Sequence, residues 1–175
     1  MTSDSPPAAR THTVVDSPVG PLTLVAADGA LVALHMVEQR YPPTAELLGD
    51  PDDGRDGELL AAAARQLDEY FDGERTAFDL RLALDGTAFQ RRVWAELQAI
   101  PYGDTLSYGQ LADRIGQPAA SRAVGLANGR NPVGIIVPCH RVVGADGSLT
   151  GYGGGLGRKR FLLAHEQQVS GQTLV

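Results

Sequence analysis

The chain has little of several features that would place it in a class at once. Cys139 is the only cysteine among 175 residues, so no disulfide can form within the chain and no site of several thiolates can be built. None of the four histidines shows the spacing of metal ligands. There is no run of about 18 apolar residues, and residues 1–7 lack the basic and apolar regions of a secretory signal. These absences predict a cytoplasmic protein with no metal, no cofactor and no membrane contact.

Basic residues are scarce in the first half of the chain. Residues 1–87 hold 6 Lys and Arg against 16 Asp and Glu, a balance of −10, although the whole chain carries only −6. Residues 88–165 hold 9 basic residues against 4 acidic ones, a balance of +5. This asymmetry predicts a polyanion-binding surface on the second half alone, and a solvated charged surface is the alternative.

The first half shows the patterns of a small α/β domain. Residues 1–10 are polar, small and proline-bearing, which predicts a disordered tail. Alternating apolar residues predict an antiparallel sheet, and apolar residues at helical spacing predict a helix over 58–71. The expected strands are 13–15, 22–26, 31–36 and 78–84, with a loop over 42–57. Asp85-Gly86 then marks the end of an N-terminal domain, 11–86.

The second half has the signals of several short helices. Thr87 can cap a helix over 88–100, and Ser107 can cap the next helix with Gln110 in capping-box position. A third helix over 119–129 follows a Gly-Gln-Pro turn, which predicts a helix-turn-helix in a C-terminal domain, 87–170. The expected fold class is therefore α+β, with the sheet in the first domain and mainly helices in the second.

The last of these helices carries little charge. Arg122 is its only charged side chain before Arg130, and its many small residues make it smooth and narrow. Such a helix suits either close approach to the wall of a DNA groove or packing inside the protein, and the residues alone favour neither.

The stretch from Ile135 to Val143 holds the one candidate nucleophile. Two apolar, β-branched runs flank a polar break and are typical of buried strand. Pro138 has no backbone N–H to donate to a neighbouring strand, which predicts that Cys139 lies on a kink at a strand end. A lone cysteine beside His140 is a candidate nucleophile, because a nearby base can take the proton of the thiol. The dipeptide alone favours the alternative, a small core residue beside a surface histidine.

Further motifs around this stretch carry a family resemblance. From Phe89 to Glu166 their order and spacing resemble those of the bacterial O6-alkylguanine-DNA alkyltransferases, also called methylated-DNA–protein-cysteine methyltransferases. Residues 12–85 resemble the N-terminal domain of that family more loosely. The motifs are Arg122–Gly125, Asn131-Pro132, Pro138–Val142, Gly151–Gly155 and Leu162–Glu166. The resemblance implies a ribonuclease H-like N-terminal domain and a winged helix-turn-helix-like C-terminal domain.

The resemblance also implies a reaction. The protein would bind double-stranded DNA containing O6-alkylguanine, flip the damaged nucleotide out of the stack and transfer the alkyl group to Cys139. Because water does not hydrolyse a thioether, each molecule would react once. Repair of O4-alkylthymine is left open. A monomer is expected in solution, and the sequence does not distinguish isolated binding from cooperative assembly on DNA.

Individual roles follow from the resemblance residue by residue. The expected catalytic residues are Cys139, His140, Glu166, Asn131 and Tyr108. His140, oriented by Glu166, would act on the thiol of Cys139 through a water. Asn131 would fix the turn before the cysteine, and Tyr108 would donate to N3 of the departing guanine.

The remaining roles concern DNA and the flipped base. The resemblance places the helix over 119–129 in the minor groove, with the Arg122 guanidinium filling the space that the flipped base leaves. The expected DNA-binding residues are Arg122, Ala123, Tyr108 and Arg130, and the expected base pocket is formed by Val137, Cys139, Tyr152, Gly153 and Gly154. Many relatives carry serine where this chain has Gly153.

Three other functions compete with this interpretation. A non-catalytic alkylguanine-DNA sensor would lack the cysteine, which is present here. A DNA-binding regulator that uses methylation of Cys139 as a signal would need a second DNA-binding module, for which the chain has no room. A cysteine hydrolase would use Cys139, His140 and Glu166 as a triad, but adjacent residues on an extended chain face opposite ways.

Overall fold

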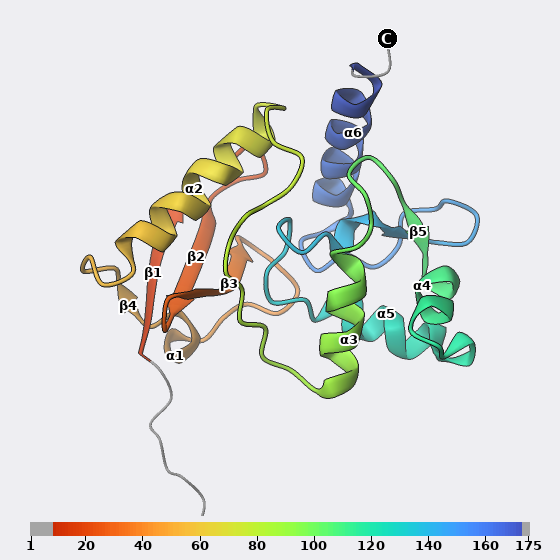
Figure 1. Cartoon of the computed structure of the whole chain (residues 1–175), viewed down its shortest axis with the longest axis horizontal. Coiled ribbons are helices and arrows are strands. Elements are labelled where there is room, and N and C mark those ends of the chain that lie inside the picture. Colours follow the sequence, from red (N-terminus) through yellow and green to blue (C-terminus); the bar gives the residue numbers. More distant parts are fainter. Residues whose placement is uncertain (1–8, 173–175) are drawn as a thin grey trace, which may run out of the picture.

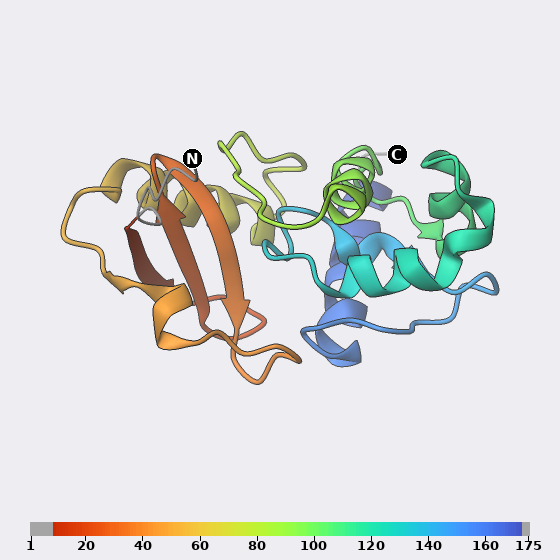
Figure 2. The same cartoon turned by 90° about the horizontal axis from the view of Figure 1, so that it is seen from below.

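The computed structural model describes residues 9–172, which form two lobes joined by an extended segment. One lobe holds the main sheet with helix α2 across it, and the other holds helices α3, α4, α5 and α6 (Figure 1). Figure 2, seen from below, shows the same separation of strands from helices. This mixture of a small sheet and a mainly helical part is the α+β class that the sequence predicts.

The main sheet has the strand order β3-β2-β1-β4. Strands β1 (Arg10–Val15), β2 (Leu22–Ala27) and β3 (Ala30–Met36) are antiparallel neighbours, and the short β4 (Asp50–Pro51) runs parallel to β1. Asp28 and Gly29 join β2 to β3 with positive φ angles of 51° and 73°, as a two-residue hairpin turn requires. The sheet therefore forms from local hairpins, with only β4 added from a distance.

Helix α2 (Gly57–Phe71) covers this sheet, and the short α1 (Ala45–Leu48) lies at its edge. The buried residues of α2 recur at helical spacing and face the strands, as the apolar pattern predicts. They are Leu60, Ala63, Gln66, Leu67 and Tyr70.

Capping boxes begin two helices of the second lobe. Thr87 caps α3 (Ala88–Leu97) together with Gln90, and Ser107 caps α4 (Tyr108–Arg114) together with Gln110. In each box the cap side chain accepts from the N3 backbone amide while the glutamine accepts from the cap residue, so two orphan donors are satisfied at once. Helix α4, a 3₁₀ turn (Pro118–Ala120) and α5 (Ser121–Gly129) then form the helix-turn-helix.

The chain ends in the segment that carries the cysteine, followed by a long helix. Cys139–Arg141 form a 3₁₀ turn, and β6 (Val142–Val143) pairs in parallel with β5 (Leu106–Ser107). Helix α6 (Leu156–Gln172) follows the glycine-rich loop and rises beside the rest of the lobe (Figure 1).

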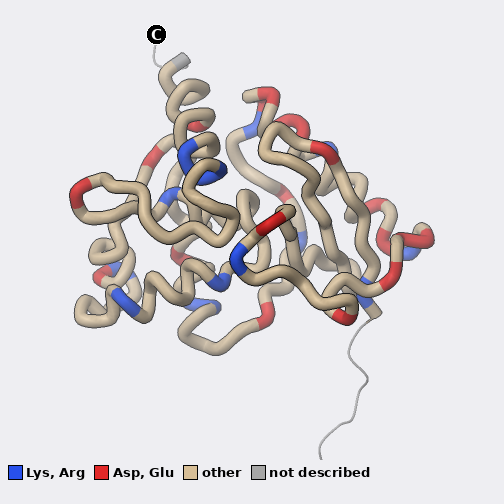
Figure 3. The backbone as a smooth tube through the Cα atoms, turned by 180° about the vertical axis from the view of Figure 1, so that it is seen from behind, with Lys and Arg blue, Asp and Glu red and all other residues tan. Residues whose placement is uncertain are grey.

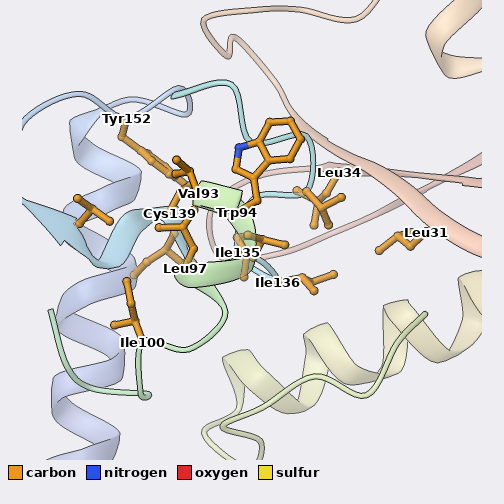
Figure 4. Close-up of a cluster of buried hydrophobic side chains, with 14 of the residues drawn as sticks. Leu31, Leu34, Val93, Trp94, Leu97, Ile100, Ile135, Ile136, Cys139 and Tyr152 are labelled. Atoms are coloured by element: carbon orange, nitrogen blue, oxygen red, sulfur yellow. The ribbon is translucent and has the colours of Figure 1, made fainter. Parts of the chain in front are cut away.

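The buried apolar residues form one core that crosses from lobe to lobe. Figure 4 shows Leu31 and Leu34 of the sheet in the same cluster as Trp94 of α3, Ile135 and Cys139. Trp94 is 1% exposed, and its Nε1 donates to the carbonyl of Ala127 at 2.8 Å, which ties α3 to α5. The position of α5 thus depends on the shared core.

Several predicted elements of the first half are corrected. The first strand begins at Arg10, inside the expected disordered tail, and residues 1–8 of that tail lie outside the described residues. The expected loop 42–57 contains α1, which Thr44 caps, and β4, where Pro51 is tolerated because it lies on an edge strand. The expected strand 78–84 is extended and alternates in burial, but forms only one bridge, between Leu82 and Leu31. Alternating burial of side chains requires an extended backbone, but it does not require hydrogen bonds to a neighbouring strand along the whole segment.

The apolar run before the cysteine is also not the predicted strand. Apart from β6, residues 135–143 form a loop and the 3₁₀ turn, although Ile135, Val137 and Val142 are buried as expected. The Asn131 side chain organises this loop, since its Nδ2 donates to the Val137 carbonyl and its Oδ1 accepts from the Val133 amide. The kink at Pro138 is confirmed. Pro138 has φ of −82° and ψ of 62°, and the Cys139 amide donates to the Val137 carbonyl, which together define an inverse γ-turn.

The helix expected over 119–129 begins as the 3₁₀ turn and becomes α-helical only at Ser121.

Within residues 9–172, no helix is long and apolar enough to cross a membrane.

We expect Trp94→Phe to lower the free energy of unfolding by roughly 2 kcal/mol, because it removes the bond to Ala127 and leaves a cavity beneath α5. Urea unfolding followed by circular dichroism measures the change. An unchanged unfolding midpoint would show that the junction of α3 and α5 does not depend on this side chain.

Candidate active site and DNA-binding surface

Cys139 lies in the wall of a cavity where the two lobes meet. Cys139 is 5% exposed, and the cavity has a volume of about 180 Å³. From the first lobe, Met36 of β3 and Arg40 of the following loop line this space. From the second lobe the cavity is lined by Asn128–Pro132, Gly134, Cys139 and Tyr152–Gly154. Three of the C-terminal motifs, Asn131-Pro132, Pro138–Val142 and Gly151–Gly155, therefore contribute residues to one cavity.

His140 and Glu166 form a buried pair next to the cysteine. His140 is fully buried, and its Nε2 lies 2.6 Å from Oε2 of Glu166, which is 1% exposed. Within the described part of the chain, Nδ1 of His140 has no hydrogen-bond partner. This geometry agrees with the expected orientation of His140 by Glu166, although the two residues are 26 positions apart in the chain.

Arg141 balances the charge of Glu166. Its Nε donates to Oε1 at 2.7 Å and its Nη2 donates to Oε2 at 3.2 Å, while Nη1 donates to the carbonyl of Ile100. Burial raises the pKa of Glu166, but the hydrogen bonds from His140 and Arg141 and the positive charge of Arg141 outweigh it and lower the pKa to about 2. The carboxylate is therefore ionised at neutral pH and accepts the proton of His140 Nε2.

The imidazole of His140 is neutral at rest. Burial lowers its pKa, and the bond to Glu166, which raises the pKa, only partly opposes that effect. Because the proton on Nε2 points to the ionised carboxylate, Nδ1 carries the free lone pair. This tautomer is the one in which His140 can accept a proton through Nδ1.

The Cys139 thiol is not ionised in advance. Burial raises its pKa, and a hydrogen bond from Asn131 and the charge of Lys159 oppose burial without overcoming it. The pKa is raised because the side chain is enclosed in the core. A base is therefore needed to take the proton when the sulfur reacts.

Lys159 of α6 is a buried cation beside this site. Its Nζ donates to the carbonyls of Val142 and Thr150, and burial lowers its pKa to about 8. It fixes the strand after the cysteine and the start of the glycine-rich loop to one helix. Neither Lys159 nor Arg141 was predicted from the sequence to be a functional residue, although Arg141 lies inside the Pro138–Val142 motif and Lys159 lies between two of the motifs.

The expected base-pocket residues are mostly at the cavity. Tyr152, Gly153 and Gly154 line it, but Val137 is fully buried beneath it and presents only its carbonyl to Asn131 and to the Cys139 amide. A Cβ at Gly154 would lie 2.6 Å from Sδ of Met36 and 2.9 Å from the Tyr152 ring, so any other residue there would displace these two side chains. A Cβ at Gly153 would meet only the Gly129 carbonyl at 3.6 Å, so the serine of many relatives is sterically acceptable.

The expected DNA-binding residues lie on or beside α5. Arg122 and Ala123 are exposed at its start, and the half-buried Tyr108 of α4 donates its hydroxyl proton to the Thr150 carbonyl at 2.9 Å. Arg130, just after α5, stacks over the ring of Tyr41 at 3.7 Å and so joins the first lobe to the second. In Figure 3 most of the acidic positions lie on the lobe that carries the sheet.

Comparison with known proteins identifies the family. Residues 11–84 match the ribonuclease-like domain of 6-O-methylguanine DNA methyltransferase, and residues 88–168 match the DNA-binding domain of the same family. A methylated-DNA–protein-cysteine methyltransferase of Mycolicibacterium paratuberculosis is 55% identical over 163 residues, which cover 93% of this chain and 96% of that protein. A protein of the same name from Methanosarcina acetivorans is 47% identical over 89% of this chain and 97% of its own.

A solved structure agrees with these matches. The crystal structure of Mycobacterium tuberculosis OGT in complex with DNA is similar with a TM-score of 0.84 and 52% identity, and it covers 91% of this chain and 94% of that one. The chain belongs to the 6-O-methylguanine DNA methyltransferase family. The resemblance noted in the sequence is thereby confirmed, as are the α+β fold class, a DNA partner and the family activity, alkyl transfer to a protein cysteine in DNA repair.

The depressed pKa of Glu166 predicts a pH-dependent contribution to stability. Because the pKa is lower in the folded than in the unfolded chain, this contribution is complete above the unfolded value and is lost as the pH falls toward about 2. We expect the difference in unfolding free energy between wild type and Glu166→Gln to shrink by roughly 2 kcal/mol between about pH 6 and pH 3. Urea titrations at several pH values measure it, and a difference that stays constant with pH would contradict the ionised, buried carboxylate.

Proposed function

We propose that the protein repairs double-stranded DNA containing O6-alkylguanine by flipping the damaged nucleotide into the cavity and transferring its alkyl group irreversibly to Cys139. One observation carries the proposal. Cys139 lies in the wall of a cavity beside His140, which is neutral and is oriented by the ionised Glu166. Family membership supports the reaction type, and this geometry supports the assignment of residues.

The proposed reaction is a direct displacement. His140 Nδ1 takes the proton of the Cys139 thiol through a water, and the sulfur forms a bond to the alkyl carbon as the carbon–O6 bond breaks. The electron pair of the broken bond passes to the guanine ring, which takes up a proton and leaves as ordinary guanine. The product on the protein is a thioether, which water does not cleave, so each molecule reacts once.

Neighbouring groups support the two charged partners of this displacement. The amide of Asn131 donates to the sulfur and Lys159 places a positive charge near it, so both favour the developing thiolate. We assign Tyr108 the role of donor to N3 of the departing guanine, because its hydroxyl lies at the loop of Thr150 and Gly151 that leads into the pocket. In the free protein the Thr150 carbonyl holds that hydroxyl in place.

Helix α5 is the proposed minor-groove element. Its exposed face carries Arg122 and Ala123, and Arg130 lies just beyond its end. Arg122 is unpaired among the residues from 9 to 172, so its guanidinium is available to fill the gap in the base stack.

The two parts of the chain would divide the work. We assign DNA binding and chemistry to residues 87–170, and we assign to residues 11–86 the support of the catalytic wall through Met36 and Arg40. We further propose that the protein acts as a monomer in the reducing cytoplasm, because Cys139 must remain a free thiol.

We expect wild type to gain one methyl group per molecule from a duplex with a single radiolabelled O6-methylguanine, and Cys139→Ser to gain none. Intact-protein mass and label counting give the stoichiometry, and an unmodified duplex is the control. Lesion binding without transfer would support the sensor instead, and repeated turnover would overturn the single-use reaction.

We expect Arg122→Ala to slow methyl transfer from duplex DNA by roughly tenfold but to slow transfer from the same lesion in a single strand much less, because unstacking costs least there. Arg65→Ala removes the same charge from the exposed face of α2 and serves as the control. Equal slowing with both substrates would assign Arg122 to phosphate binding and would contradict the wedge.

A further inference from the structure

The catalytic carboxylate has a bonding partner from the other lobe. Tyr70, in the last turn of α2, is fully buried, and its Oη donates to Oε2 of Glu166 at 2.6 Å. The two residues lie 96 positions apart in the chain. Packing on the apolar face of α2 does not require a hydroxyl at this position, since a phenylalanine would supply the same packing.

This bond is of the strong kind. An O–H group that donates to an ionised carboxylate gives a distance of about 2.5 to 2.7 Å, as observed here. Burial, and then the charge of Glu166, raise the pKa of Tyr70, so the hydroxyl keeps its proton and can act only as a donor toward the carboxylate. Oε2 therefore receives Tyr70, His140 and one nitrogen of Arg141 together.

Both the side chain and the backbone of Tyr70 make further contacts. Its ring packs against Phe78 and Tyr102, at centroid distances of 5.5 Å and 6.2 Å. Its carbonyl lies 2.8 Å from Nε2 of His165, the residue immediately before Glu166. The end of α2 is thus bonded to two consecutive residues of α6, which fixes the position of the Glu166 side chain relative to both lobes.

We propose that Tyr70 is a positioning residue for the alkyl transfer, whose hydroxyl holds the Glu166 carboxylate so that His140 turns its Nε2 proton to Glu166 and its free Nδ1 toward the reacting thiol. The inference rests on the proposed function. It gives the N-terminal lobe a part in the chemistry, which acts through Glu166 and not through contact with DNA or base.

Removal of the hydroxyl changes the electrostatics in a defined direction. With one donor fewer, the negative charge of Glu166 is less satisfied, so it stabilises a protonated His140 more strongly and the pKa of His140 rises. The other charged or titratable groups near this pair are Arg141, Lys159, Tyr102 and Tyr152, and the substitution leaves all of them in place. The pKa values of both tyrosines are raised, chiefly by burial, so their hydroxyls keep their protons and carry no charge. At a given pH more of His140 is then unable to accept a proton.

The test measures the single-turnover rate of methyl transfer by the full chain with protein in excess, from roughly pH 5 to 9. For Tyr70→Phe we expect about a tenfold loss at neutral pH and an acid limb of the rate profile displaced to higher pH. The matched control is Tyr102→Phe, because among residues 9–172 the buried Tyr102 hydroxyl has no hydrogen-bond partner. We expect its rate profile to equal that of wild type.

Two further arms separate positioning from folding. Urea unfolding of both variants shows whether they are equally folded, and the double variant Tyr70→Phe with Glu166→Gln shows whether Tyr70 acts through the carboxylate. Once Glu166 is neutral, adding Tyr70→Phe should cause no further loss of rate. Additive losses, a wild-type profile for Tyr70→Phe, or equal slowing at every pH would each overturn the inference, whereas no transfer by wild type itself would overturn the proposed function.

Discussion

The structure depends on one buried negative charge, the Glu166 carboxylate. An isolated carboxylate in a protein interior would take up a proton, because the loss of hydration costs several kcal/mol. Here Arg141 supplies the opposite charge, while His140 and Tyr70 supply further hydrogen bonds. These partners come from the 3₁₀ turn after the cysteine and from α2 of the other lobe, so satisfying this charge requires α2, α6 and the cysteine segment to be in place together.

Burial also keeps the Cys139 thiol protonated in the free protein. Enclosure raises the pKa of the Cys139 thiol, and an un-ionised thiol reacts slowly with oxidants and other electrophiles. A protein that uses its nucleophile once gains from this protection. In the proposed reaction, reactivity comes from the groups around the thiol. The carboxylate of Glu166 sets which nitrogen of His140 carries the free lone pair, and the Asn131 amide and the Lys159 ammonium group favour the thiolate.

Local signals made part of this structure predictable. The capping boxes at Thr87 and Ser107 depend on contacts three residues apart, and both were readable from the sequence. The loop before Cys139 was not, because β-branched residues indicate burial, while the path of the chain is set by the Asn131 side chain and by a left-handed φ of 70° at Ile135. His140 and Glu166 were expected together from the resemblance, and the structure brings them into contact, while their catalytic roles remain predictions. Tyr70 gave no signal, since its spacing on α2 is that of a core residue and its partner is remote in sequence.

Charge separation answers how a chain of net charge −6 can bind DNA. The acidic excess belongs to the first 87 residues and the basic excess to the residues that follow, so the potential near α5 differs from that of the whole molecule. Screening limits the range of each charge to about 8–10 Å in physiological salt. The electrostatic interaction with a duplex is therefore set mainly by the charges of the lobe that the duplex contacts. The acidic lobe repels DNA that approaches from its own side. It therefore favours the proposed orientation, in which α5 faces the groove, so the lobe that contributes Tyr70 to Glu166 would also restrict how DNA approaches.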